Sequence, residues 1–170
     1  GTASGTPSNT EAQDHWSAGY FKQGEDMGLS DLASMDPNAT CDRGQVAVWV
    51  SEAFDLGGED IEYGDEFPDV TGGSDAGHYA AVYEYGIFTG DSETGNLRPN
   101  DEINRAEVSK VVNVAAEATG LEDDLDAVQE ALDDVEIVET DDGFIEGNVV
   151  EEEVSLLDLL KNFFSSVFSF

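Results

Sequence analysis

The strongest constraint on the fold of this chain is an internal repeat around two arginines. Pro37-Asn38 and Pro99-Asn100 precede Arg43 and Arg105 at the same spacing. A sequence pattern that recurs at a fixed period is typical of repeat architectures, in which each unit buries an apolar face against its neighbour. The sequence therefore predicts at least two copies of one structural unit.

Each of the two arginines opens a predicted helix. Asp42 with Gln45, and Asn104 with Glu107, have the spacing of a capping box, in which each side chain satisfies the free backbone N–H of the other residue. Apolar side chains then follow at helical spacing until a glycine ends the pattern in each copy. We expect helices that begin near Asp42 and near Asn104.

A shorter helix is expected before each of these. Residues 15–27 have an apolar face and are followed by Gly28, and residues 78–85 have another and are followed by Gly86. Each copy therefore reads as helix, loop, helix. We place repeat one at residues 13–57 and repeat two at 58–120, after a flexible leader at 1–12 that is small and polar.

Residues 121–170 allow two interpretations. They form either a degenerate third repeat, or a helix at 122–133, a hairpin around Asp142-Gly143 and a closing helix. Residues 154–170 are the most apolar stretch, and a helix that is apolar around most of its circumference must be buried. We expect this stretch to complete the core of the repeats; the alternative is that it docks into a neighbouring subunit.

Cys41 lies at an apolar position of the pattern and is expected to be a buried structural thiol.

Repeat two resembles an S-layer homology repeat. That family has an aromatic-Asp-Val start, a Gly-Ile-x-x-Gly motif, a Phe/Leu-x-Pro loop and a helix that opens with Thr-Arg-Ala-Glu. Repeat two contains, in order, Phe67-Pro68-Asp69-Val70, Gly86-Ile87-Phe88-Thr89-Gly90, Leu97-Arg98-Pro99 and Asn104-Arg105-Ala106-Glu107. Repeat one keeps the His15-Trp16 start, but Asp42-Arg43-Gly44-Gln45 replaces the helix signature. The similarity is good over residues 13–120 and loose beyond them.

The resemblance implies a fold, a function and a location. The fold would be an all-α, pseudo-threefold domain of helix-loop-helix repeats, with the third repeat degenerate. Such a domain is not catalytic and binds cell-wall polysaccharide noncovalently, often an acidic one. The expected location is extracellular, at a cell surface, a cell wall or a surface layer.

The charge of the chain excludes several classes of partner. Thirty-nine Asp and Glu face six Lys and Arg, which gives a formal net charge of -33. Nucleic acid and anionic membranes are poor partners because both require a basic surface. Self-repulsion of this charge destabilises a compact state, so the sequence is typical of a halophilic protein or one that binds divalent ions. The periodic apolar segments argue against disorder of the whole chain, and no apolar run is long enough to span a membrane.

Four candidate glycan-binding residues lie at the predicted helix starts. Arg105 and Arg43 are there because a guanidinium and a helix N-terminus both favour a carboxylate. The alternative is that each arginine only pairs with neighbouring carboxylates. Glu107 and Gln45 are expected to act first as caps and only second as ligand contacts.

Four further candidates come from the family motifs. Asp69 bonds either the backbone at a helix start or a sugar hydroxyl. Trp16 and Tyr79 either stack on sugar rings or belong to the core, where aromatic residues at helical spacing are more common. Gly86 is included because it belongs to the Gly-Ile-x-x-Gly motif.

Metal binding and catalysis have weaker support in the sequence. Asp91, Glu93 and Glu102 occupy positions 1, 3 and 12 of a twelve-residue calcium loop, but the central glycine is displaced, so an ordinary loop is the alternative. His15 and His78 have no Ser or Cys nucleophile at a glycine elbow, and no glycine-rich phosphate loop is present. We therefore expect a protein that is not an enzyme.

Three functions follow from these patterns. We favour attachment to cell-wall polysaccharide. The first alternative is a self-assembling filament or lattice subunit whose repeats are only structural. The second alternative is a calcium-dependent module that binds proteins.

Overall fold

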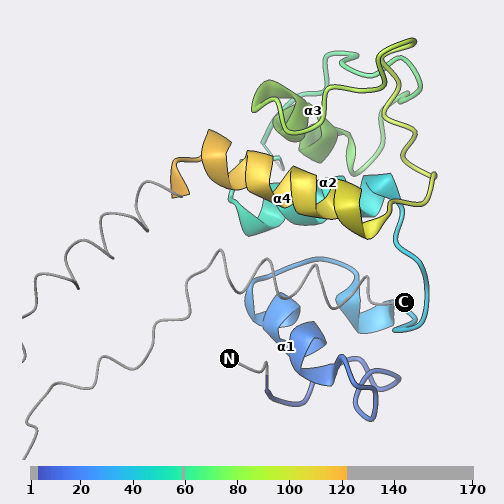
Figure 1. The fold of residues 1–170 in the computed structure, drawn as a ribbon, viewed down its shortest axis with the longest axis vertical. Coiled ribbons are helices and arrows are strands. Elements are labelled where there is room, and N and C mark those ends of the chain that lie inside the picture. Colours follow the sequence, from blue (N-terminus) through green and yellow to red (C-terminus); the bar gives the residue numbers. More distant parts are fainter. Residues whose placement is uncertain (1–3, 59, 122–170) are drawn as a thin grey trace, which may run out of the picture.

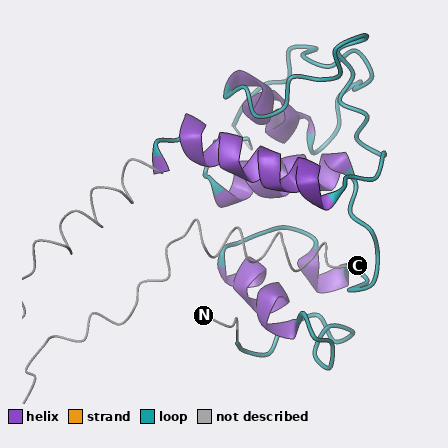
Figure 2. Cartoon of the chain, in the orientation of Figure 1, coloured by secondary structure: helices purple, strands orange, loops and turns teal. Residues whose placement is uncertain are grey.

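The computed structural model describes residues 4–58 and 60–121. Within these residues the chain is all helical, as predicted, and contains no strand (Figure 2). The elements are α1 (Ala18–Asp26), the short 3-10 helix η1 (Leu32–Ser34), α2 (Arg43–Ala53), α3 (Ala76–Glu84) and α4 (Arg105–Ala118). The two interpretations of residues 122–170, including the closing segment 154–170, fall outside the described residues, and so does the third unit of the expected pseudo-threefold arrangement.

Helix α2 lies at the centre of the described structure. It packs against α3 and α4, whereas α1 packs with η1 (Figure 1). Six consecutive residues of α2, from Val46 to Ser51, are buried, so this helix is covered on more than the single face that the sequence pattern predicts. A helix that is apolar all round is a core helix.

The segments 13–57 and 58–120, the two predicted repeats, contribute to one hydrophobic core. The large side chains that are almost completely buried are Trp49, Phe21, Phe67, Leu32, Leu97, Val46, Val50, Val82 and Val108. The indole N–H of Trp49 also donates a hydrogen bond to the carbonyl of Ser30 at 2.9 Å, which ties α2 to the segment after α1. The helices of the two copies therefore form one packed unit.

The start of α2 satisfies its free N–H groups with acceptors from two sources. Arg43 N–H donates to the Asp101 carbonyl at 2.9 Å, and Gly44 N–H donates to the Pro99 carbonyl at 2.8 Å. The N–H of Gln45 donates to Oδ1 of Asp42, at 2.7 Å. These acceptors leave the first turn of α2 without a free donor for another molecule.

The start of α4 has the complete capping box that the sequence predicts. The side chain of Asn104 accepts from the N–H of Glu107 at 3.1 Å, and the side chain of Glu107 accepts from the N–H of Asn104 at 3.1 Å. At α2 only half of the predicted box forms, since within the described residues Gln45 makes no reciprocal bond with its side chain. The loop of repeat two supplies the additional acceptors at that helix.

The segments that precede α2 and α4 pair with each other. Asp42 and Glu102 form an isolated antiparallel bridge, and the N–H of Ile103 donates to the carbonyl of Cys41 at 3.2 Å. Equivalent positions of the two repeats therefore lie against one another. Cys41 is buried as expected, and burial raises the pKa of its thiol to about 12.

Residues 4–12, the described part of the expected leader, include side chains that contact the segments around α1 and η1. The side-chain amide of Asn9 donates to the carbonyls of Leu32 and Met35, both at 2.7 Å, and Asn9 and Ala12 are buried. The carboxylate of Glu25 accepts from the backbone and the hydroxyl of Ser8. The small and polar composition of this segment does not by itself predict these contacts, because their acceptors lie elsewhere in the chain.

Helix α3 packs closely against the segment that follows α2. A Cβ atom on Gly77 would lie 2.1 Å from the carbonyl oxygen of Gly58 and 2.7 Å from that of Ile61. Both atoms belong to the backbone and cannot move aside, so a glycine is required at this position.

None of the described helices is long and apolar enough to cross a lipid bilayer.

Candidate functional site

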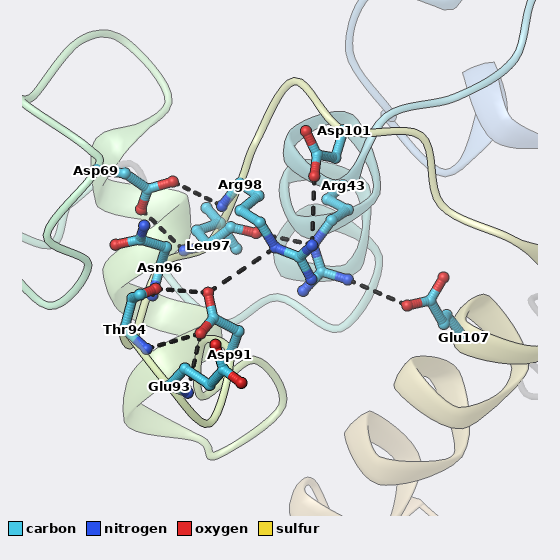
Figure 3. A network of polar contacts seen from close by, with 10 residues as sticks. All are labelled: Arg43, Asp69, Asp91, Glu93, Thr94, Asn96, Leu97, Arg98, Asp101 and Glu107. Carbon is cyan, nitrogen blue, oxygen red and sulfur yellow. Dashed lines mark hydrogen bonds and ion pairs between the residues drawn. The ribbon is translucent and has the colours of Figure 1, made fainter.

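Leu97 is held from both sides by side chains of the two repeats. Its N–H donates to Oδ1 of Asp69 at 2.9 Å, and the next N–H, of Arg98, donates to Oδ2 at 2.7 Å. On the other side, Nε of Arg43 donates to the Leu97 carbonyl at 2.8 Å (Figure 3). Both oxygens of Asp69 therefore bond backbone, but in the loop before α4 and not at a helix start as expected.

The side chain of Arg43 makes its contacts within the protein. Its Nη1 lies 3.5 Å from Oε1 of Glu107, and its guanidinium carbon lies 5.4 Å from the centre of the Phe88 ring, within the range of a cation–π contact. The side chain of Arg43 is only 13% exposed. This geometry corresponds to the alternative in which the arginine pairs with a neighbouring carboxylate.

Arg105 occupies the equivalent position of repeat two in a different environment. It is exposed at the first position of α4. The N–H of the following residue, Ala106, has no hydrogen-bond acceptor among the described residues, whereas the equivalent N–H of Gly44 bonds to Pro99. A cationic side chain and an accessible helix N-terminus together form a surface that suits an anionic group.

Glu107 connects the cap of α4 to Arg43. One of its oxygens accepts from the Asn104 N–H, and the other lies against the Arg43 guanidinium. This double role agrees with the prediction that Glu107 acts first as a cap. Gln45 takes part in the α2 cap through its backbone N–H.

An open hollow of about 250 Å³ lies between the start of α3 and the loop of repeat two. Residues 69–76 line it together with Tyr79, Pro99 and Asn100. Its walls therefore combine the exposed carboxylate of Asp69, the phenol of Tyr79 and the amide of Asn100. These are the hydrogen-bonding groups that bind hydroxyls, and the volume is below the usual range for drug-sized ligands, so the hollow suits a small unit such as one sugar ring.

Tyr79 is largely buried, as the core interpretation predicted, but it also borders this hollow. Burial, followed by the charges of Asp75 and Asp42, raises the pKa of its hydroxyl to about 12. The phenol is therefore protonated at neutral pH and can donate a hydrogen bond. Its ring is too buried to serve as a stacking platform.

Two of the predicted site residues lie apart from these groups. Trp16 is 56% exposed and stacks at a tilt on His15, with ring centres 5.3 Å apart. Gly86 follows α3 with a φ of 69°, a left-handed conformation that favours glycine at the end of a helix. Gly86 therefore has a clear structural role, and Trp16 has no contact with the Arg43 network or the 250 Å³ hollow among the described residues.

The three carboxylates proposed for calcium are not gathered into one site. Within residues 4–58 and 60–121, no three His, Cys, Asp or Glu side chains form a group that could hold a metal. Asp91 instead accepts from the backbone and hydroxyl of Thr94, and these bonds lower the pKa of its carboxyl. Glu102 accepts from the hydroxyl of Thr40 at 3.0 Å, in the pairing between the repeats.

Sequence reasoning missed Pro99, Asn100 and the glycine-rich turn of residues 72–73 as lining of the hollow. A signal for Pro99 and Asn100 was present, because the Pro-Asn pair defines the repeat. Gly44 was a second signal, since it replaces the alanine of the family motif. A Cβ atom there would lie 2.7 Å from the Tyr79 hydroxyl and 3.0 Å from the Pro99 carbonyl oxygen, so the glycine allows the loop of repeat two to pack onto α2.

Comparison with known proteins gives one result. Residues 66–109 match the profile of the S-layer homology domain. Comparison with curated proteins and with solved structures gives no match. The matched segment includes Asp69, Tyr79, Gly86, Arg105 and Glu107 and ends within α4.

Proposed function

Because the chain contains an S-layer homology domain, a non-catalytic module of cell-surface proteins, we propose that it attaches to the cell wall by binding an acidic polysaccharide. Repeat two provides the binding surface in this proposal. The observation that carries it is the family match itself, because the matched segment contains the exposed Arg105 and two candidates that line the hollow, Asp69 and Tyr79.

Arg105 is the proposed contact for a carboxylate of the polysaccharide. Two features support this choice: Arg105 is exposed, and the N–H of Ala106 beside it has no acceptor among the described residues. Arg43 is not proposed as a contact, because its guanidinium bonds Leu97 and Glu107. A bond between a charged donor and a charged acceptor is short and strong, so an exposed guanidinium favours an acidic sugar over a neutral one.

The hollow beside Tyr79 is the proposed contact for sugar hydroxyls. The Tyr79 phenol and the Asn100 amide supply donors there, and Asp69 supplies acceptors. Asp69 is fixed by its bonds to Leu97 N–H and Arg98 N–H, so its carboxylate is already oriented before a ligand arrives. A group held in place by the fold loses little freedom on binding.

The test is sedimentation of the full chain with purified cell-wall sacculi. Arg105→Gln is expected to weaken binding by about 10-fold or more, because a hydrogen bond to a charged group contributes about 1.5–3 kcal/mol. Lys110→Gln is the matched control: it removes the same charge from the exposed face of the same helix and is expected to change binding little. Melting curves of all variants show that they remain folded.

Two results would contradict the proposal. If folded Arg105→Gln sediments like the parent protein, the start of α4 is not the binding surface. If the parent fails to sediment with sacculi but forms large particles alone, the repeats serve self-assembly instead. Equal losses in Arg105→Gln and Lys110→Gln would indicate a general charge effect rather than a defined site.

A further inference from the structure

The segment that connects η1 to α2 contains a second chemical signal, unrelated to the binding surface. Asn38-Ala39-Thr40 has the pattern Asn-x-Ser/Thr, with x other than proline, and it is the only such triplet in the 170 residues. This triplet is the acceptor sequence for N-linked glycans in exported proteins. We infer that Asn38 is a glycosylation site.

The three residues of the triplet are all exposed. They lie in the connection between η1 and α2, which runs along the outer edge of the described structure (Figure 1). Two local bonds shape this turn: the N–H of Asn38 donates to Oδ1 of Asp36 at 2.8 Å, and the N–H of Ala39 donates to the Asp36 carbonyl at 3.0 Å. A transferase can therefore reach the turn without unfolding a helix.

The acceptor atom itself is weakly engaged. Nδ2 of Asn38 lies 3.4 Å from Oδ1 of Asp36, near the outer limit of a hydrogen bond. The Thr40 hydroxyl, the second group that defines the triplet, donates to Oε1 of Glu102 at the surface. Both contacts are between exposed side chains. Water can replace either hydrogen bond, so breaking them costs the transferase little free energy.

The reaction requires an activated sugar as co-reactant, namely an oligosaccharide linked to a membrane lipid through a diphosphate. Nδ2 of Asn38 forms a bond with the anomeric carbon of the first sugar, the bond between that carbon and the phosphate oxygen breaks, and the lipid diphosphate leaves. Nδ2 gives up one proton to a base of the transferase. Such donors are used during export, which agrees with a protein of the cell surface.

Repeat two provides an internal comparison. Pro99-Asn100 corresponds to Pro37-Asn38, but Glu102 stands where repeat one has Thr40, so Asn100 is not an acceptor. Asn100 lines the proposed sugar hollow, whereas Asn38 lines none of the described hollows. A glycan on Asn38 would therefore leave that hollow open, and the inference depends on the surface location and not on polysaccharide binding.

The test is to export the full chain from a host that glycosylates its secreted proteins and to map the product by mass spectrometry. Trypsin cuts after Lys22 and Arg43, so residues 23–43 form one peptide that contains the whole triplet. We expect a glycan on this peptide in the parent protein and in Thr40→Ser, which keeps the hydroxyl. Asn38→Gln and Thr40→Val should lose it, and Asn100→Gln should keep it.

The inference is overturned if peptide 23–43 of the exported parent is unmodified while a reference glycoprotein from the same cells is modified. It is also overturned if the sugar persists in Asn38→Gln. The melting temperature of Asn38→Gln is expected to equal that of the unglycosylated parent, because the residue is exposed. Sacculus binding is measured separately, so failure of either proposal leaves the other intact.

Discussion

Arg43 and Glu107 lie 64 positions apart in the sequence, and their side chains form an ion pair of 3.5 Å that joins α2 to α4. Each residue belongs to the helix start of a different repeat. Glu107 is 43% exposed whereas Arg43 is 13% exposed, so the buried partner depends on the contact more than the exposed one. The pair therefore joins the two repeats through Arg43, whose side chain has little access to water.

Arg43→Ala is expected to lower the free energy of unfolding by about 1.5–3 kcal/mol, the usual contribution of a hydrogen bond that involves a charged group. The variant leaves the Leu97 carbonyl without its donor and removes the cation from the Phe88 ring. Urea titration at constant salt is the measurement. Arg98→Ala, whose side chain is 48% exposed in surface ion pairs, is the control and should cost less than about 1 kcal/mol. Equal losses in the two variants would mean that the pairing between repeats adds nothing.

Gly77→Ala is expected to destabilise the protein by about 1–3 kcal/mol, the range found when a core is overpacked. Helix propensity alone predicts the opposite sign, because alanine is favoured over glycine by about 1 kcal/mol in a helix. The added Cβ would meet the carbonyl oxygens of Gly58 and Ile61, which cannot move aside. Ala106→Gly, at an exposed position of α4, measures propensity by itself. A rise in the melting temperature of Gly77→Ala would show that α3 can move away from the segment it contacts.

The stability of the chain is expected to increase with salt. The formal net charge of -33 repels itself over a Debye length of about 10 Å at 0.1 M salt and only about 3 Å at 1 M. Thermal melts in KCl from 0.1 to about 2 M give the measurement. An unchanged melting temperature would refute the halophilic interpretation. A rise that needs only millimolar calcium would indicate specific ion binding, for which the described residues show no site.

Asp91 is expected to make stability depend on pH in acid. Hydrogen bonds from Thr94 hold its pKa below the usual value of 3.8, so its contribution is fully present above that pH and is lost as the pH falls through the lower, folded-state pKa. Asp91→Asn should therefore melt below the parent at neutral pH, and the difference should shrink in strong acid. Glu93→Gln, in the same loop, is the control, since Glu93 contributes its backbone N–H to this network. If the difference in melting temperature between Asp91→Asn and the parent persists in strong acid, the charge of Asp91 is not its cause.

Local chemistry made the helices predictable. The capping residue Asn104, its partner Glu107 and the glycine after each apolar pattern placed the helix starts and ends within a few residues of those observed. These signals lie within one turn of the chain and depend on no distant partner. The same holds for the buried thiol of Cys41, which follows from its place in the apolar pattern.

Distant partners made the site harder to predict. Arg43 and Arg105 both follow a capping residue at a predicted helix start, yet the side chain of Arg43 is largely buried and Arg105 is exposed. The difference arises because the loop from Leu97 to Asp101 packs on the start of α2, and residues so far apart reveal no contact in a single sequence. The contacts of Asn9 could not be predicted for the same reason, because its acceptors at Leu32 and Met35 lie far from it in the sequence.

The pairing of residues 41–44 with residues 99–103 crosses the boundary of the segment that matches the family profile. Sequence similarity defines the segment 66–109. Backbone carbonyls of its loop accept hydrogen bonds from Arg43 and Gly44, which lie outside that segment. Excised at those limits, the fragment would present the carbonyls of Leu97, Pro99 and Asp101 to water and lose the apolar cover that α2 provides. The segment that sequence similarity defines is therefore shorter than the segment that packs as one unit, and a fragment that keeps these bonds has to begin before Cys41.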